Sequence, residues 1–158
     1  MFKSKFFVTL AALAAIAAIV AGGAVAGSPA PKVTGDVTFT NLGYTQHWVF
    51  SAQDLGTAGA KGSVLDEWNG STSTAKVIKA NVLDAHTATF TTEITSTDGM
   101  NPYVHVGDQF SYTVHDGGEG TSGSGDSFEY EGYTDGSGFH PAGSPNHYDI
   151  TSGNIQIH

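Results

Sequence analysis

A glycine-rich stretch carries the residues that most suggest chemistry. Asp116, Glu119 and Asp126 lie in it, between two segments of alternating hydrophobicity. Calcium takes about six to eight oxygen ligands, and glycines let backbone carbonyls turn towards an ion. These three acids are therefore candidate calcium ligands, although their spacing is not that of an EF-hand loop or of a calcium-binding nonapeptide repeat. The alternative is a flexible hairpin loop in which Asp116 and Asp126 bond nearby backbone amides.

Two other patterns bear on catalysis. Glu129 and Glu131 lie two residues apart, and glycoside hydrolysis uses a pair of carboxylates. Phe128 and Tyr130 alternate with them in the sequence. We therefore expect the two acids on a solvated strand face, outside a cleft. The serine in Gly123-Ser124-Gly125 lies in a run of small residues, without the strand-to-helix context of a nucleophile elbow.

Seven histidines raise the question of zinc. They show neither the helical i, i+4 spacing nor the His-Glu-x-x-His pattern of a zinc site. We therefore interpret them as exposed or hydrogen-bonded side chains. They are His47, His86, His105, His115, His140, His147 and His158.

Aromatic side chains are the remaining candidates for binding. Tryptophans and tyrosines stack on sugar rings and on apolar ligands, but aromatics at alternating strand positions more often belong to the core. Tyr133 and Tyr148 lie among loop residues. They are the predicted ligand-binding residues.

Strands must position all of these residues, because no segment has helical periodicity over three turns. Residues 109–115 and 87–95 alternate apolar with polar side chains, and other short segments of this kind follow at spacings of about ten residues. Gly-containing turns separate many of them, which favours antiparallel neighbours. We predict an all-β fold, an antiparallel up-and-down β-barrel of about eight strands, with a two-sheet β-sandwich as the alternative. The turns include Asn69-Gly70, Asp98-Gly99 and Asp135-Gly136.

The first 26 residues have the pattern of an export signal. Lys3 and Lys5 precede an uncharged, Ala-rich stretch that ends on Ala24-Val25-Ala26, a small-x-small cleavage motif. We predict cleavage after about Ala26, a flexible lead-in over residues 27–31, and a single all-β domain over residues 32–158. The rival interpretation is an uncleaved membrane anchor, since a spanning helix needs about 20 residues.

The remaining chain is strongly acidic. Without the signal it has four lysines, no arginine and fifteen acidic residues, a formal charge of −11. Such a chain is repelled by nucleic acids and by anionic membranes, so we expect neither as a partner. The lack of cysteine excludes disulfides and thiolate sites, and favours a bacterial secreted protein over a eukaryotic one.

Two motifs stand out in the chain after the signal: Asp116-Gly117-Gly118-Glu119-Gly120 with the later Asp126, and the closing Gly153-Asn154-Ile155-Gln156-Ile157-His158. With these as its most specific motifs, the chain resembles the post-COAP family of secreted bacterial proteins, and the resemblance spans nearly the whole chain after the signal. The resemblance implies an exported, β-rich domain with no assigned catalytic residues and no established ligand.

Together these observations predict a secreted, monomeric, non-enzymatic β-domain. It would bind a small molecule in the mouth of the barrel or an extracellular surface polymer through its loops, with Ca²⁺ as a candidate structural ion. One alternative is an enzyme acting on extracellular polysaccharide through Glu129, Glu131 or loop acids. A second is a structural subunit of a cell-surface assembly.

Overall fold

Antiparallel β-strands make up nearly all of the regular structure. The computed structural model describes residues 29–118, 125–143 and 146–158, and ten strands lie within these ranges. The strands are β1 (Lys32–Asn41), β2 (Tyr44–Asp54), β3 (Ala60–Trp68), β4 (Ser71–Val82), β5 (Thr87–Thr97), β6 (Gln109–His115), β7 (Ser127–Asp135), β8 (Gly138–Pro141), β9 (His147–Asp149) and β10 (Ser152–Ile157). The only helical segment in these ranges is the short 3-10 turn η1 (Gly56–Ala58), and no helix there is long and apolar enough to cross a membrane.

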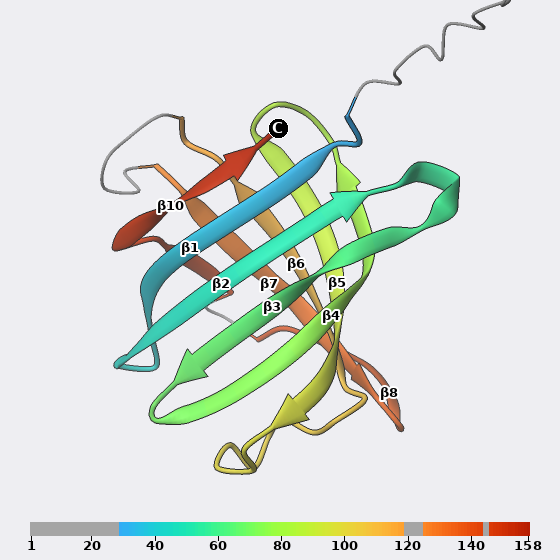
Figure 1. Cartoon of the computed structure of the whole chain (residues 1–158). Coiled ribbons are helices and arrows are strands. Elements are labelled where there is room, and N and C mark those ends of the chain that lie inside the picture. Colours follow the sequence, from blue (N-terminus) through green and yellow to red (C-terminus); the bar gives the residue numbers. More distant parts are fainter. Residues whose placement is uncertain (1–28, 119–124, 144–145) are drawn as a thin grey trace, which may run out of the picture.

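The strands pair in up-and-down order. The path through the sheet is β10-β1-β2-β3-β4-β5-β6-β7-β8, with β9 paired to β7. In Figure 1, β1 to β4 form the near wall and β5 to β7 the wall behind it. The predicted all-β class and up-and-down order are confirmed. The described strands number ten where about eight were expected, because β8 and β9 are short additional strands on β7.

The sheet is an open barrel. No continuous ladder joins β7 to the β1–β10 pair, but the chain from β9 to β10 crosses between them. Ile150 N donates to Asp126 O at 3.1 Å, and Thr151 N donates to Thr38 O at 2.8 Å. This crossing continues the wall where strand pairing stops.

Two carboxylates complete that crossing. Both oxygens of Asp126 accept backbone hydrogens, from Gly117 N at 2.8 Å and Ile155 N at 2.6 Å. Both oxygens of Asp116 do the same, from Gly118 N at 2.8 Å and Ile157 N at 3.0 Å. We call this contact between Asp116, Asp126 and β10 the seam. At the seam, the two aspartate side chains accept the backbone amides of β10 that a neighbouring strand would otherwise accept.

Alternation along the strands fills the interior with aromatic rings. Trp48 lies near the centre, with ring centroids 4.6 Å from Tyr112, 5.0 Å from Phe128 and 5.2 Å from Phe50. The predicted alternation holds in β5, whose residues Ala88, Phe90, Thr92 and Ile94 are all buried. These rings pack together with the buried valines, isoleucines and alanines of the strands, and their burial removes apolar area from water.

Candidate ligand-binding site

A cavity of about 240 Å³ lies at one end of the barrel. This is the lower end in Figure 1, where the β1–β2 turn, the β3–β4 turn and the β5–β6 loop come together. We call this space the mouth cavity. Its described lining residues are Phe39, Asn41, Leu42, Gln46, Trp48, Asp66, Trp68, Asn101, Tyr103, Val104, Phe110, Tyr112, Phe128, Tyr130 and Tyr148.

Strand register brings the polar part of this lining together. Gln46 on β2 is opposite Trp68 on β3, and Trp48 on β2 is opposite Asp66 on β3. Directly opposed residues in an antiparallel pair share one face of the sheet. Because Trp48 is in the core, its neighbours Gln46 and Asp66 must also face inwards.

A short chain of hydrogen bonds orients these groups. Asn41 Nδ2 donates to Gln46 Oε1 at 2.9 Å, and Gln46 Nε2 donates to Asp66 Oδ1 at 2.6 Å. Gln46 is therefore held at both ends of its amide, and Asp66 receives one hydrogen bond. No other hydrogen bond to Asp66 is present within the described part of the chain.

The electrostatics of Asp66 follow from this setting. The pKa of its carboxyl is raised from about 3.8 to about 6, chiefly because burial disfavours the charged form. The hydrogen bond from Gln46 opposes this rise, and the negative charge of Glu67 adds to it. No Lys, Arg or His is among the described lining residues. Asp66 is thus an ionisable group in an aromatic cavity without a cationic partner, and perturbed carboxyls in cavities mark candidate functional sites.

Aromatic faces make up most of the wall. Phe128 and Tyr148 stack at 4.9 Å with an interplanar angle of 15°, and Tyr112 meets Trp48 edge-on. Burial raises the pKa of Tyr112 well above its usual value, and the charge of Asp66 adds to this; burial also raises the pKa of Tyr130. Both hydroxyls therefore stay neutral at physiological pH.

The mouth cavity continues in two directions. A hollow of about 40 Å³ extends it inwards and shares Trp48, Asp66 and Tyr112 with it. An open groove of about 470 Å³ adjoins it outside, shares Leu42 and Tyr148, and is also lined by His147 and Asp149. At the rim, Leu42 and Tyr103 are 78% and 80% exposed. The entrance is therefore apolar and accessible.

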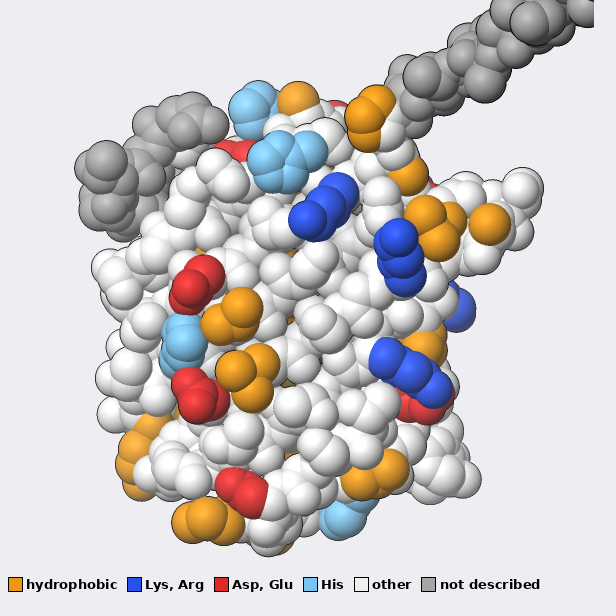
Figure 2. Space-filling view, in the orientation of Figure 1, with side chains coloured by type: hydrophobic (Ala, Val, Ile, Leu, Met, Phe, Trp, Pro, Cys, Tyr) orange, Lys and Arg blue, Asp and Glu red, His pale blue; other side chains and the backbone are white. Residues whose placement is uncertain are grey.

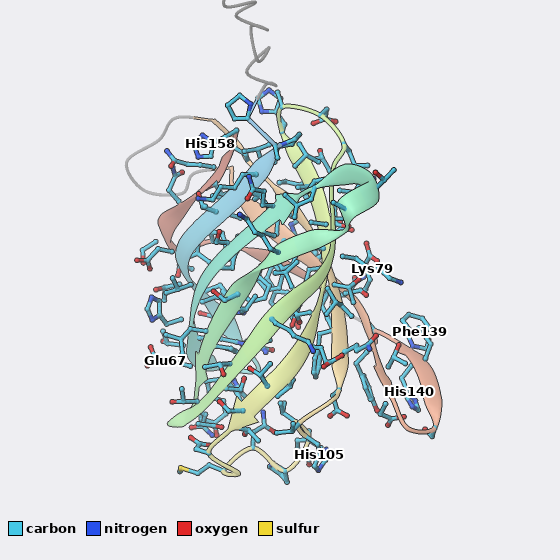
Figure 3. All side chains as sticks on the ribbon, turned by 45° about the vertical axis from the view of Figure 1, so that its right-hand side comes forward. Glu67, Lys79, His105, Phe139, His140 and His158 are labelled. Carbon is cyan, nitrogen blue, oxygen red and sulfur yellow. The ribbon has the colours of Figure 1, made fainter. Side chains whose placement is uncertain are left out.

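The two predicted ligand-binding tyrosines lie in different places. Tyr148 on β9 lines the mouth cavity and the adjoining groove. Tyr133 on β7 does not, because its ring is stacked between Phe110 at 5.9 Å and His140 at 4.5 Å. Figure 3 shows His140 and Phe139 on the β7–β8 hairpin, which stands away from the barrel wall. Ligand binding by either tyrosine stays a prediction.

Two of the three candidate calcium ligands, Asp116 and Asp126, belong to the seam. All four carboxylate oxygens of Asp116 and Asp126 accept backbone amide hydrogens. Glu119 lies outside the described residues. Within residues 29–118, 125–143 and 146–158, no three His, Cys, Asp or Glu side chains form a metal-binding group. Because the proposed trio includes Glu119, calcium binding here stays a prediction.

A cluster of charged groups lies on the outer face of the sheet. The ring of His47 on β2 bridges Asp36 Oδ1 at 2.9 Å and Glu67 Oε2 at 2.8 Å. Both hydrogen bonds raise the pKa of His47, and the one to Glu67 has the larger effect. Acidic side chains and a histidine gather on the outer face of the sheet in Figure 2. Neither Glu129 nor Glu131 is among the described residues that line the mouth cavity, the inner hollow or the outer groove.

Sequence reasoning missed Asp66, Gln46 and Asn41. The sequence does contain a signal for two of them. Side chains two residues apart on a strand share a face, so the core residues Trp48 and Val64 place Gln46 and Asp66 on the inner face. Comparisons of the chain with protein-family models, with curated proteins and with solved structures found no match. The resemblance to the post-COAP family therefore stays a prediction that rests on the motifs alone.

Proposed function

We propose that this protein is an exported, non-enzymatic binding protein that holds a small, largely apolar molecule in the mouth cavity. The supporting observation is the cavity itself: aromatic walls, a few convergent polar groups and an accessible rim. Ligand pockets typically combine these features, and the mouths of β-barrels are common places for them.

The lining favours binding over hydrolysis. Glycoside hydrolases position two carboxyl groups about 5 to 9 Å apart around the scissile bond. Asp66 is the only carboxyl among the described lining residues of the mouth cavity. A binding role requires no second acid, whereas the carboxylate-pair mechanism does.

The proposal is tested by NMR titration of the purified protein with small ring compounds: benzyl alcohol, 2-phenylethanol, indole and 2-phenylethylamine. Binding in the mouth cavity is expected to shift the indole N–H resonances of Trp48 and Trp68, which line it. If no compound shifts either resonance up to about 5 mM, where binding would be weaker than about 3 kcal/mol, the proposal is wrong.

A blocking variant locates the binding. Val104 lines the mouth cavity, so Val104→Trp should fill space and weaken binding by about tenfold. The matched control is Val106→Trp, since Val106 lies in the same loop, is 64% exposed and does not line the cavity. Equal affinities for the two variants would place the ligand elsewhere.

A further inference from the structure

We infer that the mouth cavity selects a small organic cation, an amine or quaternary ammonium group on an apolar body, and that the Asp66 carboxylate is its counter-ion. This inference rests on the proposed function and specifies the class of ligand. It joins three independent features: an unpaired acid, the aromatic faces around it, and the charge of the whole chain.

The first feature is the incomplete coordination of Asp66. Asp66 is partly buried: its Oδ1 accepts from Gln46, and its second oxygen has no protein partner in the described structure and stays accessible. A carboxylate that is largely removed from water is stabilised by further donors or by a cation. Here the missing partner would be supplied by the ligand, from the cavity side.

The second feature is the aromatic surround. Trp48 lies directly across the β2–β3 pair from Asp66, and Trp68 follows Asp66 on the same face of β3. Tyr112 is close enough for the charge of Asp66 to raise the pKa of its hydroxyl. Electron-rich ring faces attract cations within about 6 Å, and sites for quaternary ammonium groups are built from such rings. Apolar rings alone would not distinguish a cation from a neutral ligand, but rings beside a carboxylate do.

The third feature is charge. The chain has a formal net charge of −9, so its field attracts cations and repels anions. The four lysines of the described chain, Lys32, Lys61, Lys76 and Lys79, do not line the mouth cavity. Figure 2 shows lysine side chains on the outer face of the sheet, and Figure 3 shows Lys79 pointing away from the barrel. An anionic ligand would meet no compensating cation in this lining.

A neutral ligand offers a competing explanation with the opposite pH dependence. A protonated Asp66 would donate a hydrogen bond to a ligand carbonyl or hydroxyl, and binding would strengthen below pH 6. A cationic ligand needs the ionised form, so its binding strengthens as the pH rises through 6. The other titratable groups facing Asp66 are tyrosines: Tyr112 on β6, Tyr130 on β7, Tyr148 on β9 and Tyr103 in the β5–β6 loop, with Glu67 beside it on β3.

The test uses a matched pair of probes, 2-phenylethylamine and 2-phenylethanol, which differ at one terminal group. Their affinities are measured by tryptophan fluorescence at pH 5 and pH 8. We expect the amine to bind about tenfold tighter than the alcohol at pH 8, and this preference to fall to about threefold or less at pH 5.

Variants assign the preference to Asp66. Asp66→Asn keeps an acceptor for Gln46 and should abolish the preference at pH 8 while leaving 2-phenylethanol binding in place. Glu67→Gln removes the neighbouring outward-facing charge and should keep the preference. If Asp66→Asn does not fold, the pH dependence of the unaltered protein carries the test.

Each result has a distinct meaning. Equal binding of amine and alcohol at pH 8, or an amine preference that survives in Asp66→Asn, overturns this inference and leaves the proposed function standing. Binding of the alcohol that strengthens towards pH 5 overturns it in favour of a protonated Asp66. Failure of both probes to bind counts against the proposed function itself.

Discussion

Two aspartates at opposite ends of the barrel, one buried and one partly buried, have opposite hydrogen-bonding environments. At the seam, Asp126 is 2% exposed and both of its oxygens accept backbone amides. At the mouth, Asp66 has a single donor, Gln46, and a free oxygen beside a cavity. The same residue type thus completes the fold in one place and is left incomplete in the other. A buried carboxylate whose donors all come from the chain is structural, and one that lacks donors is available to a ligand.

The largest effect is expected at the seam. Asp126→Ala leaves Gly117 N and Ile155 N without acceptors, and each orphaned donor costs about 1 to 3 kcal/mol. We expect a loss of about 3 kcal/mol in the free energy of unfolding, measured by urea denaturation. Asp149→Ala is the control, because the Asp149 side chain is 90% exposed. Similar costs for both variants would contradict a structural role for Asp126.

A calcium ion would add a second role to the two seam carboxylates. If Asp116, Glu119 and Asp126 hold an ion in the folded state, calcium at about 100 times its Kd should stabilise the protein by about 2.7 kcal/mol. The thermal unfolding midpoint would then be higher with calcium than with chelator, and Asp116→Ala would remove the difference. If the unfolding curves with calcium and with chelator superimpose, calcium does not bind here, and the seam carboxylates only accept backbone amides.

At the mouth the expected effect has the opposite sign. The pKa of Asp66 is raised from about 3.8 to about 6, so the folded state holds its proton more tightly than the unfolded state does. Asp66 therefore destabilises the fold as the pH rises from about 4 to 6, and the full cost is present above pH 6. Asp66→Asn should raise the free energy of unfolding by about 2 kcal/mol at pH 8 and leave it unchanged near pH 4.

Urea denaturation at the two pH values measures this difference. Glu67→Gln, which removes the adjacent acid on the outer face, should change stability by less than about 1 kcal/mol at either pH. If Asp66→Asn is instead less stable at pH 8, the Asp66 carboxylate is stabilised by hydrogen bonds in the folded state, as the Asp126 carboxylate is at the seam.

The smallest effect concerns the rim of the mouth. Leu42 has a φ of 52°, a left-handed conformation that costs a leucine about 1 kcal/mol. Leu42→Asn should recover about that amount in urea denaturation, because Asn-Gly suits a two-residue turn of this kind. Leu83→Asn is the control, since Leu83 is also exposed but has no positive φ. Equal changes in both variants would show that exposure, and not backbone strain, is the cause.

Strand positions were predictable where alternation is strong. Residues 87–95 and 109–115 form β5 and β6 with the expected faces inwards, and Asn69-Gly70 forms the β3–β4 turn with both residues at positive φ. The Leu42-Gly43 turn carried no such signal, because leucine rarely adopts that conformation. Tyr133 was expected among exposed loop residues but lies within β7, where Phe110 and His140 cover its ring.

By itself the sequence determined the all-β class, the antiparallel neighbours and the acidic charge, because alternation, turn residues and composition are local properties. Only the tertiary structure decided which acidic side chains have a full set of hydrogen-bond donors. Asp126 meets the amide of Ile155 across 29 residues of chain, and Asp66 meets Gln46 across 20. Such partners are chosen by register and by the curl of the sheet, which depend on the packing of the whole barrel rather than on any one segment.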